Sequence, residues 1–140
     1  MTWLYKNHEL QDEELEDFVG FVYKITNTTN GRIYFGRKLL TKAKTLPPLK
    51  GMKRKRRSRV ESDWREYWGS SKEVLEDISL LGPNCFTREI IRLCKSKSEM
   101  SYYEVKYIVE GDALLYPDRF YNGNIMCKIN RVHMLPKKPK

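Results

Sequence analysis

Residues 20–38 read Gly20-Phe21-Val22-Tyr23-Lys24-Ile25-Thr26-Asn27-Thr28-Thr29-Asn30-Gly31-Arg32-Ile33-Tyr34-Phe35-Gly36-Arg37-Lys38. Two runs rich in β-branched and aromatic residues flank Asn30-Gly31. An Asn-Gly pair between such runs predicts a β-hairpin, because a type I′ turn needs a positive φ at both central residues. With this turn centre, the expected cross-strand pairs are Tyr23–Lys38, Ile25–Gly36 and Asn27–Tyr34.

The hairpin places an unusual set of side chains on one face of a sheet. Because side chains alternate across a strand, Tyr23, Tyr34 and Lys38 are expected on the same face. Gly36 leaves a gap on that face where a ligand or another backbone could approach. A tyrosine on a strand is most often a packing residue, so the face alone does not decide between a site and a core.

The length and composition indicate one small domain. A chain of 140 residues is long enough for a single hydrophobic core. It has no apolar run long enough to span a membrane and no secretory signal pattern. Cys85, Cys94 and Cys127 are isolated cysteines without the paired spacing of a zinc site. We therefore expect reduced thiols, a cytoplasmic protein and no membrane partner.

The formal net charge of +9 is unevenly distributed along the chain. Residues 1–18 form an acidic lead-in, and residues 131–140 form a basic tail. Between them lies a dense basic run: Lys50, Lys53, Arg54, Lys55, Arg56, Arg57 and Arg59. The run could be a solvated loop, but we favour a phosphate-binding arm because like charges this close gain most when a polyanion neutralises them. Binding should then weaken steeply with salt.

The rest of the chain predicts a small α+β domain. Residues 39–61 read as an extended loop, because Pro47-Pro48 and the basic run favour no regular structure. The elements expected after it are a short helix at 62–68 capped by Ser62, a helix from Ser71 to Leu81, a strand at 86–94, a helix at 99–110 capped by Ser98, and closing segments at 120–122 and 126–129. The sum is a three-stranded antiparallel sheet flanked by helices, spanning residues 19–130, with a long basic loop inserted after the hairpin.

Several segments resemble one known family, in the same order along the chain. Phe21-Val22-Tyr23 and Tyr34-Phe35-Gly36 stand where the GIY-YIG nucleases carry Gly-Ile-Tyr and Tyr-Ile-Gly. Further segments similar to that family are residues 67–72, 86–91 and 98–108 and the pair Tyr121-Asn122. The resemblance is closest to the SegE-like branch of phage free-standing homing endonucleases, in which a basic loop precedes Asp-Trp and Gly-Ser-Ser.

This resemblance implies a DNA endonuclease that hydrolyses phosphodiester bonds with one divalent ion. The ion would be Mg²⁺, for which Mn²⁺ could substitute, and Glu104 would be its single protein ligand. Tyr23 would act as general base or hold the attacking water, Tyr34 would orient water or phosphate, and Asn122 would support the site. Ser70 and Lys72 would join the basic run in binding nucleic acid.

The catalytic cation is the point where this chain departs from the family. Lys44 stands where members carry an arginine after the second strand. We rank Lys38 first, because it shares the face of Tyr23 and could lower the pKa of that phenol, and Arg65 second. Arg37 would point to the opposite face.

Two other functions are consistent with the sequence. One is a basic nucleic-acid-binding protein that has lost catalysis, and the other is a restriction or repair nuclease of the same family. In each case the partner is nucleic acid, double-stranded DNA for a nuclease. No obligatory protein partner is evident, a homo-oligomer is left open, and a phage-encoded protein would act in the host bacterial cytoplasm.

Overall fold

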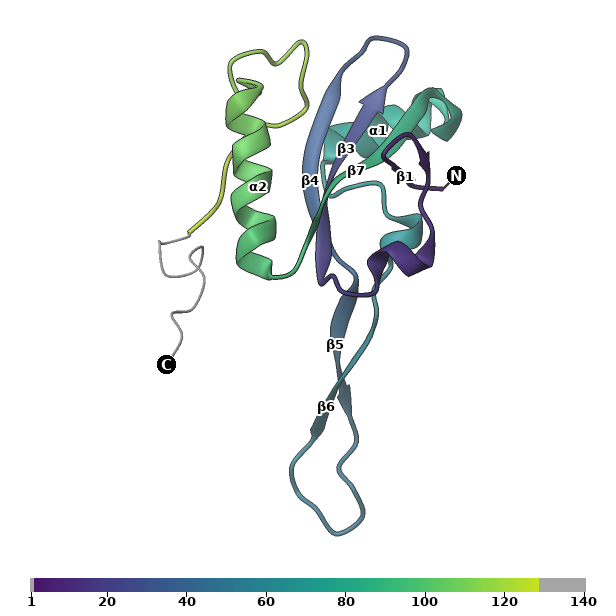
Figure 1. Cartoon of the computed structure of the whole chain (residues 1–140), viewed down its shortest axis with the longest axis vertical. Coiled ribbons are helices and arrows are strands. Elements are labelled where there is room, and N and C mark those ends of the chain that lie inside the picture. Colours follow the sequence, from purple (N-terminus) through teal and green to yellow (C-terminus); the bar gives the residue numbers. More distant parts are fainter. Residues whose placement is uncertain (1, 129–140) are drawn as a thin grey trace.

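The computed structural model describes residues 2–128. A mixed five-stranded sheet, in the order β2-β1-β7-β3-β4, is flanked by two helices, and a two-stranded ribbon projects from one end (Figure 1). The strands are β1 (Leu4–Tyr5), β2 (His8–Glu9), β3 (Gly20–Asn27), β4 (Ile33–Leu39), β5 (Thr41–Leu46), β6 (Arg56–Glu61) and β7 (Phe86–Cys94). The helices are α1 (Lys72–Leu81) and α2 (Lys97–Glu110), with 3₁₀ turns η1 (Asp12–Leu15), η2 (Trp64–Glu66) and η3 (Pro83–Cys85).

The predicted three-stranded antiparallel sheet forms one side of a larger, five-stranded sheet. β7, β3 and β4 are antiparallel as expected, but β1 joins the free edge of β7 in parallel and β2 pairs with β1. Trp3 explains this addition, because its indole is 2 % exposed and its Nε1 donates a hydrogen bond to the Trp64 carbonyl at 2.8 Å. Burying this ring brings the N-terminal segment onto the sheet, and strands of two residues leave no pattern in the sequence.

The hairpin forms, but in a register two residues away from the predicted one. Tyr23 pairs with Gly36, and Ile25 pairs with Tyr34. The turn has four residues rather than two, because the Asn27 side chain accepts bonds from the Thr29 backbone and hydroxyl at 3.0 and 2.6 Å. Gly31, with φ 76°, is the only residue of this fully described turn with a positive φ. A shift of two preserves the faces, so Tyr23, Tyr34 and Lys38 still share one.

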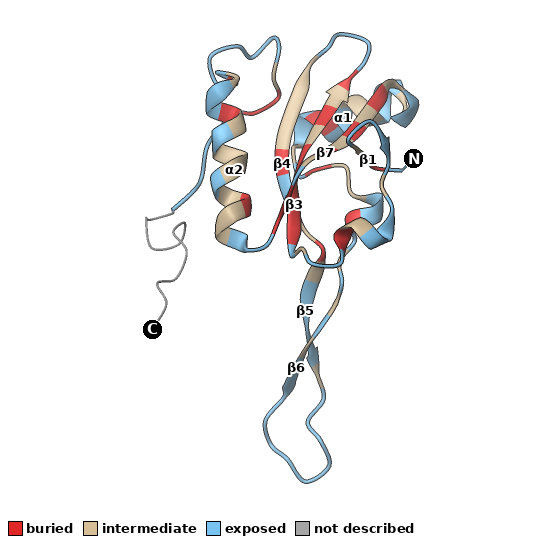
Figure 2. Cartoon of the chain, viewed as in Figure 1, coloured by how far each residue is buried: buried red, intermediate tan, exposed pale blue. Residues whose placement is uncertain are grey.

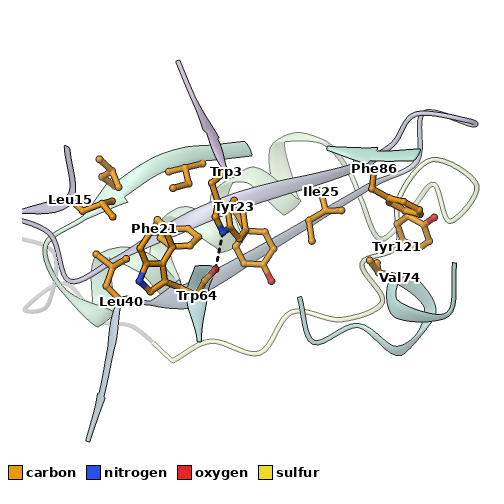
Figure 3. Close-up of a cluster of buried hydrophobic side chains, with 12 residues drawn as sticks. Trp3, Leu15, Phe21, Tyr23, Ile25, Leu40, Trp64, Val74, Phe86 and Tyr121 are labelled. Carbon is orange, nitrogen blue, oxygen red and sulfur yellow. Dashed lines mark hydrogen bonds between the residues drawn. The ribbon is translucent and has the colours of Figure 1, made fainter. Parts of the chain in front are cut away.

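The two helices cover opposite faces of the sheet. Phe21, Tyr23 and Ile25 point into the cluster that includes Trp64 and, from α1, Val74 (Figure 3). Val22 and Cys94 point the other way, onto Met100 of α2. Buried residues therefore lie along the central strands and on the inner sides of both helices (Figure 2).

Most element boundaries follow the local capping chemistry. Val74 N donates to Ser71 Oγ, which starts α1 as predicted, and Gly82 with φ 87° ends it. β7 has the predicted bounds. α2 begins earlier than expected, because Ser96 and not Ser98 accepts the bond from Glu99 N at 3.1 Å.

Two further predictions of local structure are corrected. Ser62 does not cap η2, because its hydroxyl donates to the Leu39 carbonyl at 2.6 Å and Asp63 is the N-cap residue. Phe120 forms a parallel bridge to Ile33, whereas residues 126–128 form no strand. Residue 129 and the basic tail at 131–140 lie outside the described residues.

The prediction that residues 39–61 lack regular structure is wrong. β5 and β6 pair over their whole lengths, from Thr41 opposite Glu61 to Leu46 opposite Arg56. The ribbon stands clear of the sheet and is largely exposed (Figures 1 and 2). With no buried face, it lacks the alternation of apolar residues that identifies a strand in a sequence.

Across the described residues, no helix is long and apolar enough to cross a membrane.

Candidate active site

The phenol of Tyr23 occupies the gap left by a glycine on the neighbouring strand. Tyr23 is 1 % exposed and faces Gly36 across the β3–β4 ladder. A Cβ atom on Gly36 would lie only 2.3 Å from the Tyr23 hydroxyl oxygen. On Gly69, which has φ 89°, a Cβ would lie 3.3 Å from the same oxygen. The two glycines thus leave room for the hydroxyl group of Tyr23 and for little else.

Three tyrosines gather around this gap, and we refer to Tyr23, Tyr34 and Tyr67 as the tyrosine cluster. The ring centroid of Tyr23 lies 6.2 Å from that of Tyr34 and 6.0 Å from that of Tyr67. The Tyr67 side chain lies beside that of Tyr23, and the Ser70 side chain lies beside that of Tyr34. Sequence reasoning identified Tyr34 and Ser70 but treated Tyr67 only as part of a motif.

Tyr23 and Tyr34 keep their protons at neutral pH. Burial raises the pKa of Tyr23 well above its ordinary range, and the neighbouring Tyr34 and Tyr67 raise it further. Burial also raises the pKa of Tyr34. The expected help from Lys38 is not found, because Lys38 Nζ pairs with Asp63 at 2.6 Å and lies over the Tyr67 ring, 4.0 Å from its centroid. In this state Tyr23 is a hydrogen-bond donor and not a base.

Glu104 lies on α2, the helix that covers the other face of the sheet. Its side chain is 22 % exposed, and its Oε2 lies 3.4 Å from Arg37 Nη1. Burial raises the pKa of Glu104, while the charge of Arg37 opposes that rise. The negative charge of Glu104 contributes to the raised pKa values of both Tyr23 and Tyr34, so the carboxylate interacts electrostatically with both phenols.

Arg37, which sequence reasoning set aside, is the cation that contacts Glu104. Because side chains alternate along β4, Arg37 lies on the face opposite to Tyr23. This is the face covered by α2, where Glu104 lies. Arg65 is held elsewhere. It forms bonds to Asp12 at 3.1 and 3.0 Å and to Glu61 at 2.8 Å, neither of which belongs to the tyrosine cluster.

Asn122 supports the strand that carries Tyr34. Its Oδ1 accepts a bond from Phe35 N at 3.0 Å, and its Nδ2 donates to Phe35 O at 2.9 Å. One side chain therefore supplies the pair of bonds that a further strand would give to the outer edge of β4. Phe35 stands between Tyr34 and Gly36, so Asn122 fixes the backbone next to the gap.

Arg88 was not predicted as a functional residue, yet it positions part of the site. This guanidinium on β7 is buried, and its Nη1 donates to the carbonyls of Arg65 and Tyr67 at 3.0 and 2.9 Å. It also lies between the rings of Trp3 and Trp68, 4.6 and 4.4 Å from their centroids. Burial lowers the pKa of Arg88 to about 10. Arg88 thereby holds the segment that presents Tyr67.

Comparison with known families identifies the domain. The family model described as "Putative endonuclease segE, GIY-YIG domain" matches residues 3–125. The chain belongs to this family. Comparisons with curated proteins and with solved structures gave no match. The matched range begins at Trp3 and extends past Asn122, so it covers the whole five-stranded sheet and the tyrosine cluster.

GIY-YIG domains are nucleases, phosphodiesterases in general, and they typically use divalent metals. Within residues 2–128, no three His, Cys, Asp or Glu side chains lie together as a potential metal-binding group. Among the described residues, Glu104 is the carboxylate whose charge raises the pKa values of Tyr23 and Tyr34. A single carboxylate suits a hard cation that keeps most of its own water and binds phosphate oxygens, as Mg²⁺ does.

The predicted nucleic-acid-binding residues fall into two groups in this GIY-YIG domain. The larger group lies on the projecting ribbon: Lys50, Lys53, Arg54 and Lys55 at its tip, and Arg56, Arg57 and Arg59 on β6. The smaller group lies at the sheet. Ser70 contacts Tyr34, and Lys72 is the first residue of α1. Ser70 thus lies at the tyrosine cluster, whereas the seven ribbon residues lie on an element that projects from the sheet.

Proposed function

We propose that this protein is a Mg²⁺-dependent DNA endonuclease that hydrolyses phosphodiester bonds at the tyrosine cluster, and that it serves a phage as a homing endonuclease. The observation that carries the proposal is the tyrosine cluster beside Gly36 together with the Glu104–Arg37 ion pair, whose carboxylate raises the pKa values of Tyr23 and Tyr34. A phosphodiester needs an oriented water molecule, positive charge at the phosphate and little else, and this group of residues can provide both.

Each residue has a role that follows from its surroundings. Glu104 would hold the metal ion, and the ion would supply positive charge to the phosphate oxygens when bound. Tyr23 and Tyr34 keep their protons, so they would donate hydrogen bonds that position the attacking water or a phosphate oxygen. Tyr23 could accept a proton only if bound cations lowered its pKa.

Arg37 is our first candidate for the cation that stabilises the developing negative charge. Its guanidinium already lies beside Glu104, and a guanidinium can bind two phosphate oxygens at once. Lys38 is the second candidate, because it lies over Tyr67. Arg65 is the third, since its guanidinium already forms ion pairs with Asp12 and Glu61. Asn122 would position the strand rather than touch the substrate.

The test is cleavage of long double-stranded DNA in the presence of Mg²⁺. We expect the wild type and Glu110→Gln to cut, and Glu104→Gln to bind DNA without cutting it. Glu110 is a matched control, because it lies on the same helix and pairs with a lysine at the surface. Cutting by Glu104→Gln at the wild-type rate would refute the role of Glu104. A wild type that binds DNA and never cuts would leave a binding protein that has lost catalysis.

A further inference from the structure

The excess charge of the chain lies on one projecting element, which we call the arm and define as residues 41–60. The arm contains nine Lys and Arg residues and no Asp or Glu. The chain as a whole has 27 Lys and Arg against 18 Asp and Glu, so the rest of the molecule is neutral in formal charge. An isolated concentration of positive charge of this kind is the electrostatic signature of an element that meets a polyanion.

The arm is anchored at its base and positive on both faces. Leu40 at its base is buried, and Ser62 N donates to the Leu40 carbonyl at 2.9 Å. The register places Lys42 and Lys44 on one face of the ribbon and Arg57 and Arg59 on the other. An element that lies between the two phosphate backbones of a DNA groove needs positive charge on both faces, whereas one that lies flat on a surface needs it on one.

The tip of the arm exposes apolar side chains where solvent alone would favour polar ones. Met52 N donates to the Leu49 carbonyl at 2.8 Å across a turn in which Gly51 has φ 85°. Leu49 and Met52 begin and end this turn, and they are 54 % and 62 % exposed. Pro47-Pro48 leads into it. Leu, Met and Pro are residue types that proteins insert between base steps when they bend DNA from the minor groove.

The tip also lacks the side chains that read adenine or cytosine in the major groove. Residues 46–55 contain only Leu, Pro, Gly, Met, Lys and Arg, with no amide, carboxylate or hydroxyl side chain. Recognition of adenine or cytosine in the major groove relies on Asn, Gln, Asp or Glu. Apolar residues next to cations are better suited to recognising how easily a DNA sequence deforms.

We propose that the arm enters the minor groove of DNA, that Leu49 and Met52 insert between base pairs at its tip, and that the duplex bends as a result. This inference rests on the proposed function, because it takes DNA as the substrate. The lysines and arginines would hold the phosphates on both sides of the groove. Selection of the target would then come partly from the flexibility of the DNA contacted by the tip, at a distance from the bond that is cut.

The experiment measures bending with the cleavage-deficient Glu104→Gln protein. An A·T-rich duplex of about 30 base pairs carries a donor dye at one end and an acceptor at the other. We expect the protein to raise energy transfer, consistent with a bend of about 20–90°. Adding Leu49→Ser and Met52→Ser should abolish the rise in energy transfer. The same two substitutions should lower the affinity for DNA by less than replacing the lysines and arginines of the arm would. Leu80→Ser is the control, because Leu80 is exposed on α1, away from the arm.

Two bending results would overturn the inference: equal bending by the Glu104→Gln protein with and without Leu49→Ser and Met52→Ser, or no bending by the Glu104→Gln protein itself. A third contrary result would be protection of guanine N7 in the major groove, with no competition from netropsin, a ligand of the minor groove. Cleavage by the wild-type protein is assayed in parallel. A wild type that cuts DNA without bending it refutes the role of the arm and leaves the nuclease proposal intact. A protein that neither binds nor cuts DNA refutes both.

Discussion

Gly36 is the residue on which the position of the Tyr23 phenol depends. We predict that Gly36→Ala lowers the free energy of unfolding by about 1–3 kcal/mol, because the added methyl group overlaps the Tyr23 ring and one of the two must move. Urea unfolding monitored by tryptophan fluorescence measures this change. Gly123→Ala is the control, since among the described residues nothing lies within 4 Å of a Cβ at that position. Equal stability of the two variants would mean that the gap is not filled by Tyr23.

The ion pair between Glu104 and Arg37 predicts how metal binding depends on pH. Because burial raises the pKa of Glu104, its carboxylate takes up a proton at a higher pH than an exposed glutamate does. The folded state therefore gains protons before the unfolded state, and the contribution of Glu104 to stability falls as pH rises through its raised pKa. A bound cation needs the ionised form, so its affinity should rise over the same interval.

The variant that tests this dependence is Arg37→Met. Removing the positive charge takes away the one interaction that opposes the rise, so the pH midpoint of Mn²⁺ binding should move upward from its wild-type value. Binding of Mn²⁺ measured by electron paramagnetic resonance between weakly acidic and neutral pH gives both midpoints. Lys106→Met serves as the control, because Lys106 pairs with Glu110 on the same helix. A midpoint unchanged in Arg37→Met would show that the pair does not form in solution.

At the scale of single residues, the sequence predicted which side chains share a face of the sheet but not which residues they contact. The alternation of side chains was enough to place Tyr23, Tyr34 and Lys38 on one face, and that survived the two-residue error in register. It could not show that Lys38 binds Asp63, because the two lie far apart in the chain and exposed ion pairs leave no pattern. Arg88 was missed for a similar reason, since its partners are backbone carbonyls that any residue type could supply.

At the scale of elements, prediction succeeded where local chemistry fixes an end or a buried face. α1 and β7 were predicted with their bounds, because Ser71 and Gly82 mark the helix ends and β7 is rich in apolar residues. β1, β2 and the arm were missed. The first two are held by the burial of Trp3, and the ribbon is an exposed ladder of polar residues, so the packing that fixes them is not local to their own sequence.

The segment from η2 to Tyr67 is held by hydrogen bonds from the Arg88 side chain, which comes from β7. We predict that Arg88→Lys lowers the free energy of unfolding by about 1.5–3 kcal/mol, because a lysine cannot lie between Trp3 and Trp68 and still bond both carbonyls. Thermal unfolding measures this decrease. Arg92→Lys is the control on the same strand, where the guanidinium is partly exposed over Tyr103. If the two substitutions cost the same, the buried contacts of Arg88 contribute nothing beyond an exposed stacking pair.

At the scale of the whole molecule, the proposed function would separate DNA binding by the positive arm from cutting by the rest of the chain, which is neutral in formal charge. Electrostatic attraction to DNA should come almost wholly from the arm, while the proposed phosphodiester hydrolysis would take place at the tyrosine cluster on the sheet. The domain can then release or exchange the phosphate at the tyrosine cluster without the protein leaving the duplex. Charge on the arm should consequently affect affinity far more than the rate of cutting at saturating DNA.

The salt dependence of DNA binding tests this separation. We expect a protein with Lys44, Lys53, Arg54 and Arg57 changed to Gln to bind DNA more weakly, and its slope of log affinity against log salt to fall by about 0.9 for each phosphate that the arm no longer neutralises. The control carries four Gln substitutions off the arm, at Lys6, Lys95, Lys97 and Lys106, and so has the same net charge. Titrations at several salt concentrations with the Glu104→Gln protein as background give both slopes. Equal slopes in the two proteins would mean that DNA responds to the total charge of the molecule, and the arm would lose its assigned role.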